Sequence, residues 1–161
     1  MRLLHFAALV PVLSLAACYG SEQNLYSISD GAMPLPAGDY SSANDHWDVR
    51  ITEGHYAVPA SISGLADVVL VPLPGRDRTY IVEKAEQGGF SYSLLKVLPG
   101  ARSFALLRSD CAQKADRDAA QGLATMTETR CTFENPRSLT NAMSRLADAH
   151  LPDRWTTYSL K

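Results

Sequence analysis

The chain has 161 residues, a formal net charge of −2 and an apolar content of 46%. That apolar content is ordinary for a globular fold and too high for a disordered chain. The sequence also lacks the run of basic residues that is typical of nucleic-acid-binding proteins, so no nucleic-acid partner is expected. Its length suits one domain with a substantial core.

The first 17 residues have the layout of a secretory signal. A positive start, Met1-Arg2, precedes an apolar stretch from Phe6 to Leu15. This stretch is too short to cross a bilayer, which takes about 20 residues, and Pro11 interrupts it. Small residues then lead directly into Cys18. We therefore expect residues 1–17 to be removed.

The run Leu15-Ala16-Ala17-Cys18 resembles the lipobox of bacterial lipoproteins. The resemblance implies a diacylglyceryl thioether on Cys18 and an acyl chain on its amine. Two or more such chains give stable anchoring where one does not. Lipoproteins kept in an inner membrane often have Asp at the next position, whereas this chain has Tyr19, so the resemblance favours the periplasmic face of an outer membrane. The alternative is an ordinary signal peptide, with Cys18 incidental.

Cys111 and Cys131 are the two remaining cysteines. Outside the cytoplasm, such a pair is predicted to form a disulfide. Closing a loop of about 20 residues would contribute about 3 kcal/mol to stability in the chain-entropy description. The alternative is a pair of buried thiols. The sequence has no C-x-x-C motif of the kind that supports thiol exchange.

Residues 18–36 are rich in Ser, Gly, Asn and Pro, and we expect them to form the lipidated N-terminus and a tether, with Leu25, Tyr26 and Ile28 able to pack on the domain. Residues 37–161 then form a single domain. Its first part alternates polar and apolar residues from His46 to Thr52, which predicts a strand with Trp47, Val49 and Ile51 facing the core. A turn at Glu53-Gly54 and further strands at 55–58, 68–73, 79–83, 90–98 and 102–107 complete a predicted meander.

The pattern changes after Ser109. Asp110 is a good cap for a helix over 111–122, and residues 129–133 alternate as a short strand. A second helix is expected to start at Ser138 or Thr140 and to end before Pro152, with a last strand at 155–160. The sequence thus predicts an α+β fold: an antiparallel meander followed by two helices, with short intervening and C-terminal strands.

Weak candidate metal ligands cluster around the first predicted hairpin. Imidazole and carboxylate groups of His46, Asp48 and His55 are ligand types for zinc or another divalent ion. Asp45, Asp48 and Glu53 are also candidates for the paired carboxylates of a glycoside hydrolase. The simpler interpretation is a solvated outer face with charges paired across strands, and no metal or cofactor is expected.

The sequence therefore predicts a lipid-anchored cell-envelope protein that binds or assembles another envelope protein and is not an enzyme. One alternative is a module that binds a small ligand or lipid on the concave face of its sheet. Another is a small hydrolase that uses the metal or carboxylate groups between Asp45 and His55.

Overall fold

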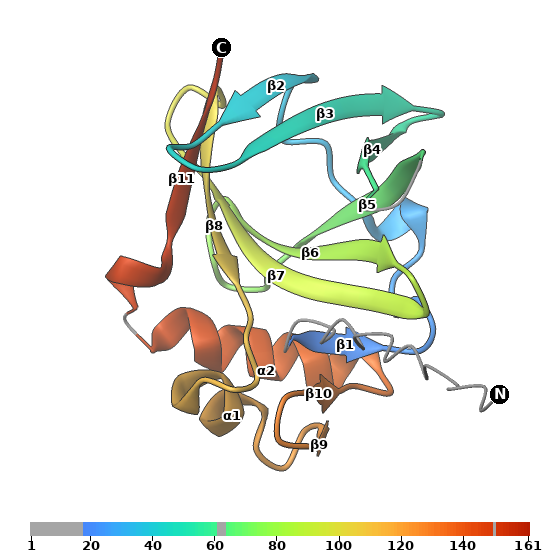
Figure 1. The fold of residues 1–161 in the computed structure, drawn as a ribbon, viewed down its shortest axis with the longest axis vertical. Helices are drawn as coiled ribbons and strands as arrows, with labels where there is room; N and C mark the ends of the chain where they lie inside the picture. The colour runs from blue at the N-terminus through green and yellow to red at the C-terminus, as the bar shows by residue number, and fades with distance from the viewer. Residues whose placement is uncertain (1–17, 61–63, 150) are drawn as a thin grey trace, which may run out of the picture.

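The computed structural model describes residues 18–60, 64–149 and 151–161. The predicted signal, residues 1–17, lies outside these ranges. Eight antiparallel strands form a closed barrel, and two helices lie beneath it in Figure 1. The barrel strands are β2 (Gly38–Ser41), β3 (His46–Thr52), β4 (His55–Pro59), β5 (Leu65–Pro72), β6 (Thr79–Glu86), β7 (Gly89–Val97), β8 (Ser103–Arg108) and β11 (Thr156–Leu160).

Seven of these strands follow one another in the chain, and each pairs antiparallel with the next. The eighth, β11, returns after the helical part and pairs with both β8 and β2. Its contact with β2 is short, with Ser159 opposite Ser41 and Leu160 opposite Tyr40. Closure leaves no free edge within the ring of eight strands. The predicted antiparallel meander is present, but it closes into a barrel, and the described residues are mostly β with two α-helices, which agrees only roughly with the predicted α+β class.

Aromatic side chains fill the barrel. Phe104 is fully buried and stacks on Tyr158, with ring centroids 5.0 Å apart and an interplanar angle of 13°. Tyr40 and Trp47 pack against the same ring at 5.2 and 5.8 Å. Aliphatic residues complete this interior core: Leu35, Val49, Val58, Ala66, Val68, Leu70, Val82, Leu95, Val97 and Leu106.

The predicted core face of β3 is only partly correct. Val49 is 5% exposed and Trp47 packs against the interior core, as expected. Ile51, however, is 48% exposed. It lies next to the β3–β4 turn, beyond the part of the strand that pairs with β2, so β2 does not flank it.

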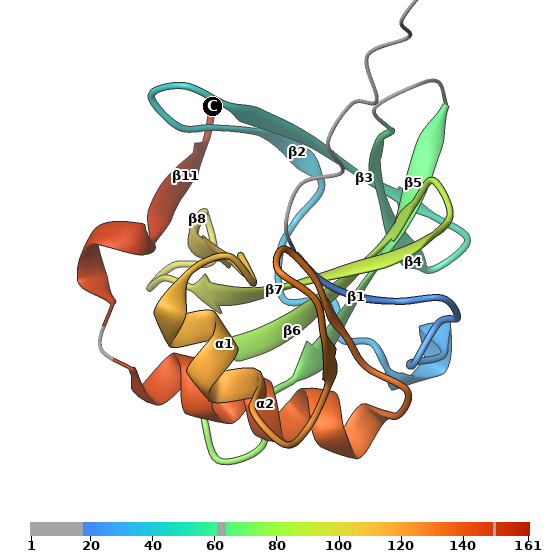
Figure 2. The ribbon, with the colours of Figure 1, turned by 60° about the horizontal axis from the view of Figure 1, so that its bottom comes forward.

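A second core lies between the outer face of the barrel and the helices, which Figure 2 shows packed side by side. Helix α2 (Pro136–Asp148) turns a stripe of apolar residues toward this core, as its spacing predicts. The remaining elements are β1 (Tyr19–Ser21), η1 (Ile28–Asp30), α1 (Lys114–Ala120), β9 (Thr125–Met126), β10 (Cys131–Thr132) and η2 (Pro152–Arg154).

Both helices start elsewhere than predicted. The predicted start of α2 at Ser138 or Thr140 is wrong, because Asn135 caps the helix by accepting a hydrogen bond from the Ser138 N–H at 2.9 Å. Pro136 then occupies the first turn, where its missing N–H costs nothing. Helix α1 is shorter than the predicted 111–122. None of the helices within the described ranges is both long and apolar enough to cross a bilayer.

Candidate functional site

Cys18 lies against the folded domain. Strand β1 begins at the next residue and runs between β7, to which it is antiparallel, and β10, to which it is parallel. The Cys131 N–H donates a hydrogen bond to the Cys18 carbonyl at 3.4 Å. This differs from the predicted tether over 18–36, because paired polar backbone groups hold the start of that segment to the barrel. The Cys18 side chain is half-buried.

Tyr19 holds β1 to the helical layer. Its side chain is fully buried, its ring centroid lies 5.0 Å from that of Phe133, and its hydroxyl donates to the Asp116 carbonyl. Its backbone N–H donates to the Ser109 hydroxyl at 3.3 Å. The backbone position of Cys18 is therefore set by the packing of the residue that follows it.

The electrostatic surroundings of Cys18 are mixed. Burial raises the pKa of the Cys18 thiol, the Arg130 guanidinium lowers it, and the carboxylates of Glu86 and Asp110 add to the rise. Cys111 and Cys131 are bonded to each other, which leaves Cys18 as the free cysteine. A thioether-linked lipid would be attached to this sulfur, in place of the thiol hydrogen.

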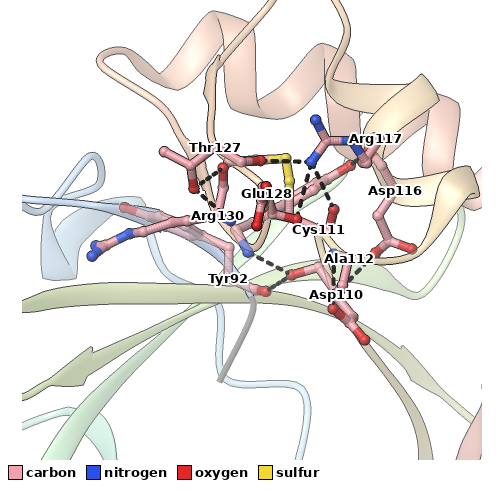
Figure 3. The surroundings of a disulfide bond; sticks show 12 residues. Tyr92, Asp110, Cys111, Ala112, Asp116, Arg117, Thr127, Glu128 and Arg130 are labelled. Carbon is pink, nitrogen blue, oxygen red and sulfur yellow. Dashed lines mark hydrogen bonds between the residues drawn. A yellow bond between two sulfur atoms is a disulfide. The ribbon is translucent and has the colours of Figure 1, made fainter. Parts of the chain in front are cut away.

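The predicted disulfide between Cys111 and Cys131 is confirmed, with the two Cα atoms 5.7 Å apart. It joins the segment after β8 to β10, the strand that pairs with β1. Figure 3 shows Arg117 beside it, donating hydrogen bonds to the carbonyls of Thr127 at 2.6 Å and Glu128 at 3.3 Å. The bridge therefore supports the strand beside Cys18.

Reducing this disulfide is expected to lower the free energy of unfolding by about 3 kcal/mol, because the unfolded chain regains the freedom of the closed loop. Chemical denaturation with and without reductant measures the loss. We expect hydrogen exchange to rise most in β10 and β1. An unchanged midpoint in the reduced protein would contradict this account.

A buried carboxylate, Glu83, holds the segment that follows β1. It is 2% exposed, and its Oε2 accepts hydrogen bonds from the Leu25 N–H at 2.8 Å, the Tyr26 N–H at 3.3 Å and the Tyr92 hydroxyl at 2.9 Å. Tyr92 is also hydrogen-bonded to Ser21 at 2.6 Å. Burial raises the pKa of Glu83, although these hydrogen bonds oppose the rise. We call Glu83, Tyr92, Ser21 and the two N–H groups the clasp.

The sequence pattern does not reveal the clasp. Glu83 ends the predicted strand 79–83, where a charged residue is commonplace. The only available signal was that Glu83 lies two residues after Ile81 and therefore shares its face of the strand. The sequence pattern also does not reveal the pair formed by Asp116 and Arg154. Asp116 is fully buried, accepts a hydrogen bond from the Asp110 N–H at 2.7 Å and forms an ion pair with Arg154.

The weak metal candidates are not brought together. His46 begins β3, whereas His55 pairs with Thr52, six residues further along that strand, which corresponds to about 20 Å. Asp48 forms an ion pair with Arg50, and the His55 Nε2 lies 2.9 Å from the Asp67 Oδ1. In the described part of the chain, no three His, Cys, Asp or Glu side chains are grouped to hold a metal ion.

The carboxylates are separated as well. Asp45 precedes β3 and Glu53 follows it, so the strand lies between them. Asp45 accepts a hydrogen bond from the Tyr158 hydroxyl at 2.9 Å and forms an ion pair with Arg108, in an open groove beside the short contact of β2 and β11. This arrangement closes the seam of the barrel.

The barrel has little free space. An apolar gap of about 10 Å³ remains among eight side chains, which is room for about one water molecule. Its lining residues are Leu35, Trp47, Val49, Tyr56, Val58, Val68, Leu70 and Leu95. Eight-stranded barrels either fill their interior with side chains or hold one small ligand, and this one is filled.

Comparison with known proteins found no protein-family model, no curated protein and no solved structure that matches this chain.

Proposed function

We propose that this chain is a lipid-anchored cell-envelope protein whose barrel is a rigid, non-enzymatic module for binding or assembling another envelope protein. The observation that carries the proposal is the position of Cys18. It ends a lipobox-like sequence, keeps a free thiol, and directly precedes the fully buried Tyr19. The lipid anchors the protein to the periplasmic face of the outer membrane, because Tyr19 stands where lipoproteins kept in the inner membrane often have Asp.

The filled barrel supports binding of a partner protein over binding of a small ligand or lipid. A lipid or drug-sized ligand needs a pocket of about 300 Å³ or more. The gap inside the barrel is about 10 Å³, and the larger space, about 510 Å³ beside Asp45, is an open groove on the outer surface. Phe104, Tyr158, Tyr40 and Trp47 occupy the space where a ligand would sit. The outer surface is thus the part of this barrel that is free to bind a partner.

The placement of Cys18 also gives the anchor a mechanical role. A lipid on Cys18 is one residue away from Tyr19, which is fixed in the sheet and hydrogen-bonded to the helical layer. The barrel would therefore stay close to the bilayer surface. We therefore expect the partner protein to lie in the same leaflet or close to its surface.

Replacing Cys18 with serine tests the proposal. We expect the variant to move from the membrane fraction to the soluble periplasmic fraction, because serine cannot form the thioether. A double variant, Cys111→Ser with Cys131→Ser, also removes cysteines but keeps the anchor, and we expect it to stay with the membranes. A Cys18→Ser protein that still partitions into detergent with the membranes would refute the anchor.

A crosslinking experiment in intact cells tests the binding role. The wild-type protein is expected to yield a defined crosslinked partner, and the soluble Cys18→Ser variant to yield at least tenfold less of it. Mass spectrometry of an organic extract of the purified protein tests the alternative. A stoichiometric apolar molecule in that extract would instead support the ligand-binding module.

A further inference from the structure

Arg130 lies beside Cys18 on the same face of the sheet. The parallel pairing of β1 and β10 sets Tyr19 next to Cys131, and therefore sets Cys18 next to Arg130. Side chains alternate along a strand, so Tyr19 and Cys131 face the buried side and Arg130 shares the opposite side with Gly20. Figure 3 shows the Arg130 side chain extending away from the disulfide.

Gly20 makes room for the guanidinium. A Cβ atom added at Gly20 would lie 3.1 Å from both the Arg130 Nη2 and the Phe90 carbonyl oxygen, and 3.3 Å from the Arg130 Nε, which is tighter than ordinary contact. The guanidinium therefore rests on the bare backbone of β1. Any larger residue at position 20 would force it to shift.

The Arg130 guanidinium has no protein partner in the described ranges. Its Nε is buried without a hydrogen-bond acceptor, and none of the ion pairs found there includes it. Most of the other arginines form ion pairs or donate to carbonyl groups, as Arg117 and Arg154 do. A partly buried cation without an anion is costly. The two Nη nitrogens of Arg130 are not among the buried groups, so an anion from outside the chain would pair with them and not with Nε.

We infer that Arg130 binds the phosphate of a phospholipid headgroup in the leaflet that holds the Cys18 lipid. This inference rests on the proposed function, because the anchor is what brings bilayer phosphates to this face. A guanidinium matches a phosphate with two parallel hydrogen bonds. The sequence has no polybasic run that would attract the membrane diffusely, so this is a single directional contact. Together with the lipid it would fix the rotation of the barrel about its anchor.

Carbon–phosphorus dipolar recoupling by solid-state NMR tests the contact. The native lipidated protein, carrying ¹³C-labelled arginine, is reconstituted in phosphatidylglycerol–phosphatidylethanolamine vesicles. We expect one guanidino carbon to be dephased by lipid phosphorus. That dephasing should be lost in Arg130→Gln and kept in Arg102→Gln. Arg102 is an exposed arginine in the turn after β7, at the opposite end of that strand from the residues paired with β1.

Failure of the Arg130 contact can be distinguished from failure of the lipid anchor. If mass spectrometry shows a free Cys18 thiol, the proposed function fails. The same protein is then attached to vesicles through that thiol with a maleimide lipid, so Arg130 is still tested. Dephasing that survives in Arg130→Gln, or is absent from the wild type, would overturn the inference. If inorganic phosphate alone, without vesicles, dephased the Arg130 guanidino carbon equally, the site would bind a free anion and not a lipid headgroup.

Discussion

Replacing Phe104 with alanine is expected to lower the free energy of unfolding by about 3–5 kcal/mol. Phe104 is fully buried at the centre of the barrel and packs against Tyr158, Tyr40 and Trp47. Deleting the ring removes its burial and leaves a void that these neighbours fill only in part. Urea denaturation of the variant and the wild type measures the difference.

Phe90→Ala is the matched control, because Phe90 is only partly buried at the edge of the second core. The same chemical change there should cost less than half as much. The void left in Phe104→Ala should also bind benzene and regain thermal stability, as an apolar cavity does. A loss at Phe104 no greater than at Phe90 would mean that the barrel interior is not a packed core.

Replacing Glu83 with alanine is expected to cost about 3 kcal/mol, because it leaves two N–H groups and a hydroxyl without their buried acceptor. Glu83→Gln is the control. All three donors meet Oε2, so the amide oxygen of glutamine can take that place, and we expect a loss below about 1 kcal/mol. Hydrogen exchange at Leu25 and Tyr26 should rise at least tenfold in the alanine variant only. Equal behaviour of the two variants would contradict the clasp.

The contribution of the clasp to the free energy of unfolding also depends on pH. Burial raises the pKa of Glu83 above its ordinary value of 4.5, so the folded state binds this proton more tightly than the unfolded state. The contribution of Glu83 to stability is then greatest below pH 4.5 and falls as the pH rises through the folded-state pKa. Relative to Glu83→Gln, the wild type should lose stability over that interval. A difference that stays constant with pH would contradict the shift.

The features that could be predicted from the sequence are those that depend on residues close together in the chain. The alternation from His46 to Thr52 matches β3, and the apolar spacing of Leu139, Ala142, Met143 and Leu146 matches the buried face of α2. The disulfide followed from redox chemistry and cysteine count. These features are set by residues close in the chain or by one covalent bond, so a single sequence contains them.

Barrel closure and the clasp depend on long-range register. β11 meets β2 across more than a hundred residues through two residue pairs, and no periodicity marks that contact. β1 has three residues, too few to show alternation. Glu83 became a buried acceptor only because residues 25 and 26 fold back over it. Segment 18–36 has the composition of a linker, but Leu25 and Tyr26 pack against the core, as their apolar character suggested, whereas Ile28 is 49% exposed.

The intact mass of the native protein purified from membranes tests the central claim most directly. We predict a chain that begins at Cys18 and carries the added mass of a diacylglyceryl group and one further acyl chain, with the Cys111–Cys131 bridge intact. A species that retains residues before position 18 and has an unmodified Cys18 thiol would contradict the account.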